Sequence, residues 1–432
     1  MSEPLAVVTP GAGRGSPGAP GAHRRRAAFG FIFATALMNA VSFGIMIPIL
    51  PNLIKQFTGG DTAAASEWNT LFTACWGVMQ VFCGPVLGTL SDRFGRRSVL
   101  LISLFGLFVD FLFMAFAPSL WWLFASRLFN GMTASTFATS NAYIADITPP
   151  EKRAKSFGLL ASAFSFGFLI GPVIGGIFGN TDLRLPFKIA AALTLVNWLY
   201  GLLVLPESLP AERRPRRMVW RRANPLGAAR FLRERRDLLG LAGVNFLFQF
   251  AQNVLPTIFV LYTGYRYGWT PKTLGFVFLA TGAAGIVVQM FLVGPVVKRI
   301  GERGAVLAGA AAGVAGFVIY ALAPTGAIYL LGIPIFAFQG LMQPGLMGLM
   351  TRRVGPQHQG ELQGANQSLQ GISTVIGPIL FGLTFAWAVR YDAHLHQPGF
   401  PIFIAAGLLF FGFILALKVA KTAVTEKQAE LA

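Results

Sequence analysis

Charged residues are scarce in this chain of 432 amino acids: Asp, Glu, Lys and Arg make up 12% of it, whereas hydrophobic residues make up 54%. Soluble domains carry about 25% charged residues, so this balance excludes an ordinary water-soluble protein. Residues 27–50 and 401–419 are nearly unbroken apolar runs. A helix needs about 20 such residues to cross a bilayer. The sequence therefore predicts a protein that crosses a membrane repeatedly.

Cysteine and histidine are also scarce. The only two cysteines, Cys75 and Cys83, lie eight residues apart in one apolar segment, which is too far along a helix for a disulfide. The histidines fall in tails and loops, at His23, His358, His394 and His396. We expect no metal site, because such sites need clustered ligands. A phosphate-binding glycine loop of the Walker type is missing too, so we expect no enzyme activity, cofactor or ATP hydrolysis.

Acidic residues are outnumbered, with 17 Asp and Glu against 35 Lys and Arg. Ten arginines gather in residues 206–237, without the alternating aromatic residues of a base-stacking surface. Positive charge favours the cytoplasmic side of a membrane protein. With both ends inside, 28 Lys and Arg fall in inner segments, 6 in outer loops, and Arg127 within a span. The distribution predicts cytoplasmic termini and no binding to nucleic acid.

Twelve apolar segments of helical length follow one another along the chain. They are residues 28–50, 67–90, 98–117, 120–145, 155–179, 185–206, 238–262, 272–297, 304–324, 327–350, 363–388 and 400–421. We expect an all-α membrane protein with six-helix bundles at 28–206 and 238–421, joined by a basic cytoplasmic linker at 207–237. A disordered basic tail is expected at 1–27 and a second tail at 422–432.

The two halves repeat each other at an offset close to 206 residues. The matching pairs are residues 93–97 with 299–303, Gly171-Pro172 with Gly377-Pro378, and Pro51 with Pro256. All of them lie at equivalent span ends. Two halves related by an axis along the membrane normal form a known transporter plan, with the substrate site between them near mid-membrane.

Glycines and charged residues gather around the connection between the second and third predicted spans. They are Gly84, Gly88, Asp92, Arg93, Gly95, Arg96 and Arg97, and Asp146 follows at the cytoplasmic end of the fourth span. This segment resembles the signature loop of the major facilitator superfamily. Glycine permits a tight turn, and Asp92 can cap a helix or bind an arginine, so the group can latch one of two conformations. The alternative is that the arginines only set the topology.

The fifth predicted span carries small residues at helical spacing together with a proline. They are Gly167, Gly171, Pro172, Gly175 and Gly176. Small faces let helices approach closely, and proline weakens the helical hydrogen bonds. The pattern resembles the motif associated with exporters of the same superfamily. Ordinary helix packing would explain the glycines but not the proline.

Further segments resemble the tetracycline-efflux branch of this superfamily, whose members are drug:proton antiporters. The segments are residues 109–111, 117–121, 144–149, 267–269 and 360–364. The resemblance covers nearly everything from Phe31 to about Trp387 except the basic linker. It implies a monomeric transporter of the bacterial inner membrane that exports a small amphipathic compound in exchange for protons.

Asp110 is the only acidic residue that the sequence places deep inside a span. It lies eight residues before Pro118, and Arg127 lies eight residues after Ser119, so the turn between the spans brings both to the same depth. Intramembrane charges of this kind are usually functional. A permanent ion pair would be structural, whereas a pair that separates would leave a carboxylate able to take up a proton. The resemblance favours the second role.

Amide side chains supply the remaining candidate contacts. Where tetracycline exporters have ionisable residues in the first, eighth and ninth spans, this sequence has Asn39, Gly285 and Gly313. A polar stripe in lipid must face protein or a water-filled cavity. We expect contacts to a neutral or weakly charged solute, or hydrogen bonds between helices, from Asn39, Asn130, Gln249, Gln252, Asn253, Gln289, Gln339 and Gln343.

Two alternative functions stay open. The missing carboxylates favour a facilitator or an uptake transporter of the same fold. A protein without transport activity is the other alternative, in which the basic linker binds a partner or anionic lipid.

Overall fold

The computed structural model describes residues 22–210, 212, 214, 236–354, 358–392 and 397–420. Within these ranges the chain is almost entirely helical and has no strand, which confirms the predicted all-α class. Most of the predicted tails and of the basic linker lies outside the described residues. The first helix begins at Ala22, inside the segment expected to be a disordered tail.

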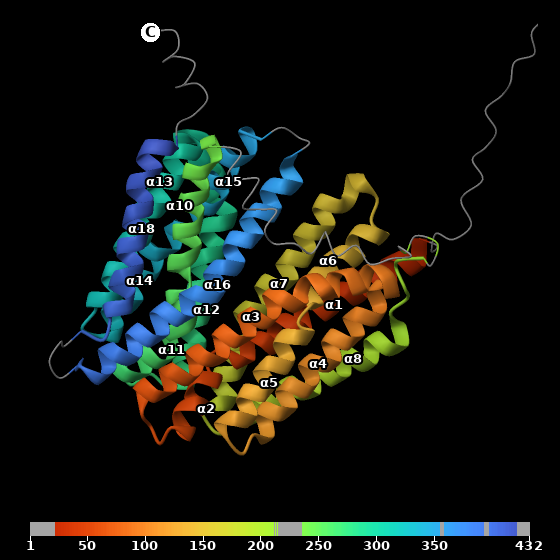
Figure 1. Ribbon diagram of the computed structural model, residues 1–432, viewed down its shortest axis with the longest axis horizontal. Coiled ribbons are helices and arrows are strands. Elements are labelled where there is room, and N and C mark those ends of the chain that lie inside the picture. Colours follow the sequence, from red (N-terminus) through yellow and green to blue (C-terminus); the bar gives the residue numbers. More distant parts are fainter. Residues whose placement is uncertain are drawn as a thin grey trace, which may run out of the picture.

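The helices form two bundles that lie beside each other (Figure 1). The N-terminal bundle contains α1 Ala22–Met46, α2 Leu50–Phe57, α3 Thr62–Phe94, α4 Arg96–Phe116, α5 Leu120–Thr133, α6 Thr136–Ile147, α7 Pro150–Gly179 and α8 Leu185–Val204. The C-terminal bundle contains α10 Arg236–Gln252, α11 Val254–Tyr267, α12 Pro271–Val287, a π-helical turn Val288–Leu292, α13 Val293–Leu322, α14 Gly326–Ala337, a 3₁₀ turn Phe338–Leu341, α15 Met342–Arg352, α16 Gln359–Arg390 and α18 Phe400–Val419.

Ten stretches of the described chain are long and apolar enough to cross a membrane. One of them, Pro271–Leu322, contains Gly301 at φ 72°, so it comprises two spans that meet at a kink. The fourth predicted span is divided between α5 and α6, of 14 and 12 residues. The prediction of twelve spans fits this arrangement.

Four spans are interrupted, and they occupy equivalent places in the two halves. The first breaks between α1 and α2, the fourth between α5 and α6, the seventh at Asn253 between α10 and α11, and the tenth at the 3₁₀ turn Phe338–Leu341. Irregular backbone inside a membrane is tolerated where protein or a water-filled cavity surrounds it. In transporters such broken helices commonly form the substrate site.

In the predicted orientation, the bundles are in contact from their outer ends to about the middle of α3 and α16, where Gly371 faces Val81. At the outer end, Ser66 donates a hydrogen bond of 2.8 Å to the Gly382 carbonyl, and Glu67 pairs with Arg390 at 2.6 Å. These contacts join α3 to α16, while α7 packs on α12. Towards the inner end, a methyl group added at Gly88 of α3, or at Gly360 or Gly364 of α16, would meet nothing within 4 Å. In the predicted orientation, the structure is therefore inward-facing.

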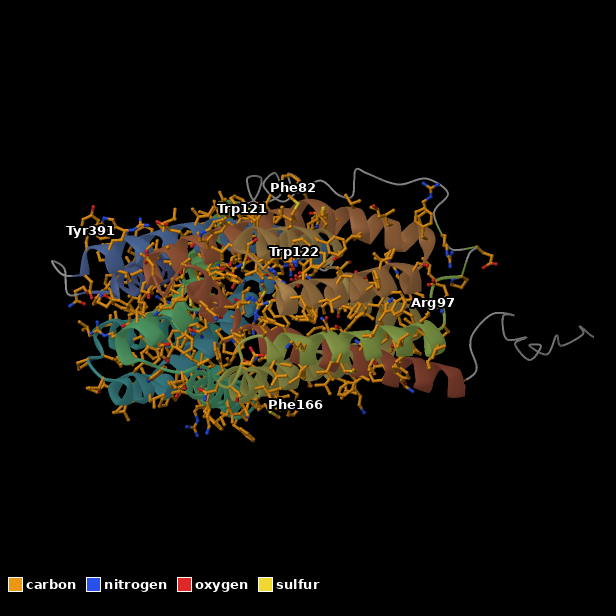
Figure 2. The ribbon with its side chains drawn as sticks, turned by 90° about the horizontal axis from the view of Figure 1, so that it is seen from below. Phe82, Arg97, Trp121, Trp122, Phe166 and Tyr391 are labelled. Atoms are coloured by element: carbon orange, nitrogen blue, oxygen red, sulfur yellow. The ribbon has the colours of Figure 1, made fainter. Side chains whose placement is uncertain are left out.

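Large apolar side chains cover the outside of the molecule. Figure 2 shows Arg97 and Tyr391 toward opposite ends, with Phe82, Trp121 and Phe166 between them. Phe82 is 71% exposed and Trp121 66% exposed. Such a surface would aggregate in water and suits the hydrocarbon of a bilayer. The chain is an integral membrane protein with many spans.

Most of the signature segment lies on a helix and not in a loop. The predicted span 67–90 already included Gly84 and Gly88, and α3 continues four residues further, through Asp92 to Phe94. Only Gly95 lies in the turn, with φ 99°. The apolar run ends where the polar residues near 92 begin, but the helix continues past that point. The fall in hydropathy therefore did not mark the end of the helix.

Candidate transport site

Asp110 and Arg127 form a buried ion pair between α4 and α5. The Asp110 side chain is 1% exposed and that of Arg127 is 5% exposed. Ser126 also donates its hydroxyl to the Asp110 carboxylate. In the part of the chain that the structure describes, these are the only charged residues that are buried. The predicted pairing is thus present in the inward-facing conformation.

The guanidinium of Arg127 is only partly satisfied. Its Nη1 lies 3.1 Å from the sulfur of Met46 and its Nη2 3.5 Å from that of Met114, and thioethers are weak acceptors. Its Nε is buried without a partner among the described residues. The pair lies six residues before the outer end of α4, about 10 Å along the helix. The pair therefore lies in the outer half of the membrane, where the two bundles contact each other.

The predicted latch residues are assembled inside the N-terminal bundle. Arg96 pairs with Asp92 at 2.6 Å and with Asp146 at 3.1 Å. Arg97 donates a hydrogen bond of 2.7 Å to the Leu202 carbonyl. Arg93 is exposed, with its guanidinium 5.3 Å from the centre of the Phe94 ring. In this conformation the described partners of these ion pairs all belong to one bundle.

Glu207 is a member of this network that the sequence analysis missed. Its Oε1 accepts a hydrogen bond of 2.8 Å from the Arg96 backbone amide, and so caps α4. The Glu207 carboxylate lies directly beside Gly95 and would have to shift if that residue had a side chain, and the φ of 99° favours glycine there. The only sequence signal was an acidic residue directly after Pro206 at the end of a span.

The C-terminal bundle repeats the network with the charges exchanged. Glu302 pairs with Arg352 at 2.9 Å, at positions 206 residues after Arg96 and Asp146. The turn glycines correspond as well, since Gly301 has φ 72° where its counterpart has 99°. The inferred duplication thus extends to side-chain contacts, although the sign of each charge is reversed.

The glycines of the exporter motif form the contact between α7 and α1. A methyl group added at Gly171 would lie 2.6 Å from the Val41 carbonyl oxygen. Gly167 and Gly175 also face α1, whereas Gly176 faces α12 of the other bundle. A methyl group on Gly275 of α12 would lie 2.6 Å from the Pro172 carbonyl oxygen. The motif therefore makes packing contacts both inside the N-terminal bundle and between the two bundles.

Several candidate amides lie at the broken helices. Gln252 donates to Gln339, which joins the break in the seventh span to that in the tenth. Asn253, at the first of these breaks, donates to the Gln249 carbonyl at 2.8 Å. Gln343 lies just beyond the second break, and its side-chain oxygen is buried with no partner among the described residues. A buried acceptor without a partner calls for an explanation, such as a water or another donor at this place.

The other candidate amides are dispersed. Asn130 accepts a hydrogen bond of 2.8 Å from the Trp76 indole. Gln289 is exposed in the π-helical turn, and Asn39 makes no hydrogen bond to any residue that the structure describes. Asn245, fully buried, donates to Asn366 at 3.0 Å. That last bond connects helices and is structural.

Gly285 and Gly313, which stand where tetracycline exporters have ionisable residues, have different surroundings. A methyl group at Gly313 would lie 2.6 Å from the Leu409 side chain, so this glycine packs closely against α18, with the Gln339 amide oxygen 3.5 Å away. A methyl group at Gly285 would meet nothing within 4 Å. Within the described ranges, no group of three or more His, Cys, Asp or Glu residues could hold a metal ion.

Comparison with known proteins agrees with this architecture. The chain is 38% identical over 355 residues to the class C tetracycline resistance protein of Escherichia coli, covering 82% of this chain and 89% of that protein. It is 24% identical over 422 residues to multidrug resistance protein 2 of Bacillus subtilis, covering 94% and 97%. A solved nucleoside transporter superposes with a TM-score of 0.70 at 14% identity, covering 92% of this chain and 99% of that one.

Two paired helical bundles with a buried charge pair and broken helices define a secondary membrane transporter. The chain belongs to the Major Facilitator Superfamily, whose sequence profile matches residues 32–378 and 246–429.

Proposed function

We infer that this chain is a proton-coupled exporter of a small amphipathic, drug-like compound. The observation that carries this inference is the buried ion pair of Asp110 and Arg127. A carboxylate inside a membrane marks a proton or ion pathway by default. The tetracycline and multidrug resistance proteins among the relatives support a drug-like solute.

The proposed cycle starts from the inward-facing conformation. The compound enters between the open inner ends, and rocking of the bundles about the site exposes it to the outside. Asp110 then takes up a proton when Arg127 moves away from it, and releases that proton inside when the pair forms again. The proton gradient supplies the energy without a cofactor. The proposed setting is a monomer in a bacterial inner membrane with both termini cytoplasmic.

The proposed solute site lies at the broken seventh and tenth spans. Gln252, Gln339 and Gln343 offer donors and acceptors but no charge there. The site therefore suits a neutral or weakly charged compound. Asn39 replaces an acidic residue of the resembling exporters, so a metal-chelated, cationic form of tetracycline would have one partner fewer than in those proteins.

Accumulation in everted membrane vesicles tests the function. We expect energised vesicles that contain this chain to accumulate tetracycline or another amphipathic drug, and an uncoupler to abolish the accumulation. Vesicles with the Asp110→Asn variant serve as the control. Equilibration that ignores the uncoupler would contradict proton coupling. It would favour a facilitator, the second candidate, to which the uncharged Gly285 and Gly313 already point.

A further inference from the structure

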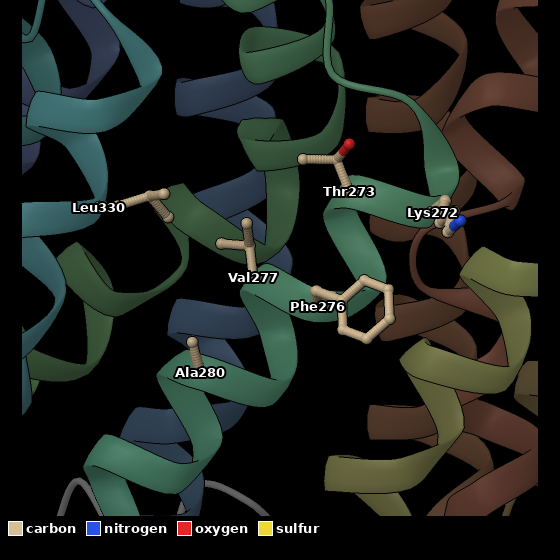
Figure 3. A pocket seen from close by; sticks show the side chains of 6 residues that line it. All are labelled: Lys272, Thr273, Phe276, Val277, Ala280 and Leu330. Atoms are coloured by element: carbon tan, nitrogen blue, oxygen red, sulfur yellow. The ribbon is translucent and has the colours of Figure 1, made fainter.

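A small apolar groove lies between α12 and α14 near the outer end of the C-terminal bundle (Figure 3). Its volume is about 360 Å³. It is lined by Lys272, Thr273, Phe276, Val277 and Ala280 of α12 and by Leu330 of α14. The α12 residues extend over about 12 Å of helix. None of them belongs to the proposed transport site.

Aromatic side chains indicate the depth of this groove. Trp269, three residues before Lys272, packs 5.5 Å from Tyr329 and 5.3 Å from Tyr267. Trp and Tyr gather where the headgroups meet the hydrocarbon. Lys272 on the first turn of α12 therefore lies at headgroup level, and Ala280 lies two turns deeper, within the hydrocarbon.

The chemistry of the groove changes along its length. Lys272 is the only charged lining residue, and it forms no ion pair with any residue that the structure describes. Phe276 and Leu330 are 48% and 41% exposed, so the apolar walls are open to the surroundings. Ala280 is small and leaves room at the deep end. A cation above an apolar slot is complementary to an anionic amphiphile.

We propose that this groove binds one anionic phospholipid, with its phosphate at Lys272 and an acyl chain between α12 and α14. A protein helix about 10 Å across would not fit a slot of this size. α12 also carries the contact between Gly275 and Pro172 that joins the two bundles. The lipid therefore lies against a helix on which the inward-facing arrangement depends.

Lipid binding to the purified full-length chain tests this proposal. The chain is titrated in detergent with dioleoylphosphatidylglycerol, and the first bound lipid is counted by native mass spectrometry. We expect Lys272→Gln to weaken this first step about fivefold, the effect of one lysine near a phosphate. Ala280→Trp fills the slot and removes the step. Lys188→Gln, at a half-exposed lysine on α8 of the other bundle, leaves it unchanged.

Three results would overturn the proposal. The first is equal binding by the parent chain and Lys272→Gln, a change at an exposed residue that does not threaten folding. The second is equal binding of dioleoylglycerol, which lacks the phosphate, because the lysine would then be irrelevant. The third is competition by inorganic phosphate at the same concentration as the lipid, which would mean that an ion site, not a lipid groove, is present.

Discussion

At the residue scale, Asp110 and Arg127 have unequal surroundings. The carboxylate is bound by its partner and by Ser126. The guanidinium also faces two methionine sulfurs, and its Nε has no partner in the part of the chain that the structure describes. The arginine therefore has more to gain from another acceptor than the aspartate has from another donor. This asymmetry makes Arg127 the member of the pair that we expect to move.

The ion pair also predicts a pattern of stability. Asp110→Asn or Arg127→Gln alone leaves a buried charge without its partner, which costs about 3–5 kcal/mol. The double variant leaves no charge and should recover most of that loss. Unfolding midpoints in detergent measure the effect. A double variant no more stable than the weaker single variant would show that the charges do not depend on each other.

At the scale of helices, the breaks in the seventh and tenth spans place polar amides inside the membrane. Asn253 and Gln339 lie at these breaks, where the backbone leaves regular helical geometry. Hydropathy predicted the spans themselves, because twenty apolar residues are needed to cross the bilayer. It could not predict the breaks, since each involves only a few residues within a window that remains apolar.

The contact between α7 and α1 offers a matched pair of substitutions. Gly171→Ala adds a methyl group 2.6 Å from the Val41 carbonyl oxygen, so we expect a loss of about 1–3 kcal/mol from overpacking. Gly158→Ala on the same helix meets nothing within 4 Å and should be neutral or stabilising by up to about 1 kcal/mol. Thermal unfolding compares them. Equal effects would mean that the motif does not act through close packing.

At the scale of the whole molecule, the outer end is closed and the inner end is open. The ion pair of Glu67 and Arg390 crosses between the bundles at 2.6 Å and must break when the outer end opens. On the inner side, the charge networks are completed within each bundle, by Asp146 in one and Arg352 in the other. The inward-facing arrangement therefore depends on contacts of the outer end.

The pair between the bundles predicts a shift in conformational equilibrium. Glu67→Gln should lower the ratio of inward-facing to outward-facing molecules about two- to fivefold, the range expected of an exposed ion pair. Exchanging the residues, with Glu67→Arg and Arg390→Glu, should restore it. Spin labels at positions 86 and 363, on the inner parts of α3 and α16, report the ratio through their distance. An unchanged distance distribution in Glu67→Gln would exclude this role.

The sequence predicted some residues of the candidate site and missed others. Asp110 and Arg127 could be paired from their equal distances to one short turn, and the structure pairs them. Glu207 could not be found, because it reaches α4 from a segment 111 residues away. The sequence also did not reveal that the Arg96–Asp146 pair and the Glu302–Arg352 pair are equivalent. The duplication was recognised from identical residues, and in these two pairs the acidic and basic residues exchange places.

Proton movement driven by substrate would show whether Asp110 couples export to the proton gradient. Everted vesicles with an acidified interior are given tetracyclines and other amphipathic drugs, and the proton release is recorded beside Asp110→Asn vesicles with the same amount of inserted protein. We expect release with at least one compound in the parent and none in the variant. Full proton release in Asp110→Asn would contradict the role of this carboxylate.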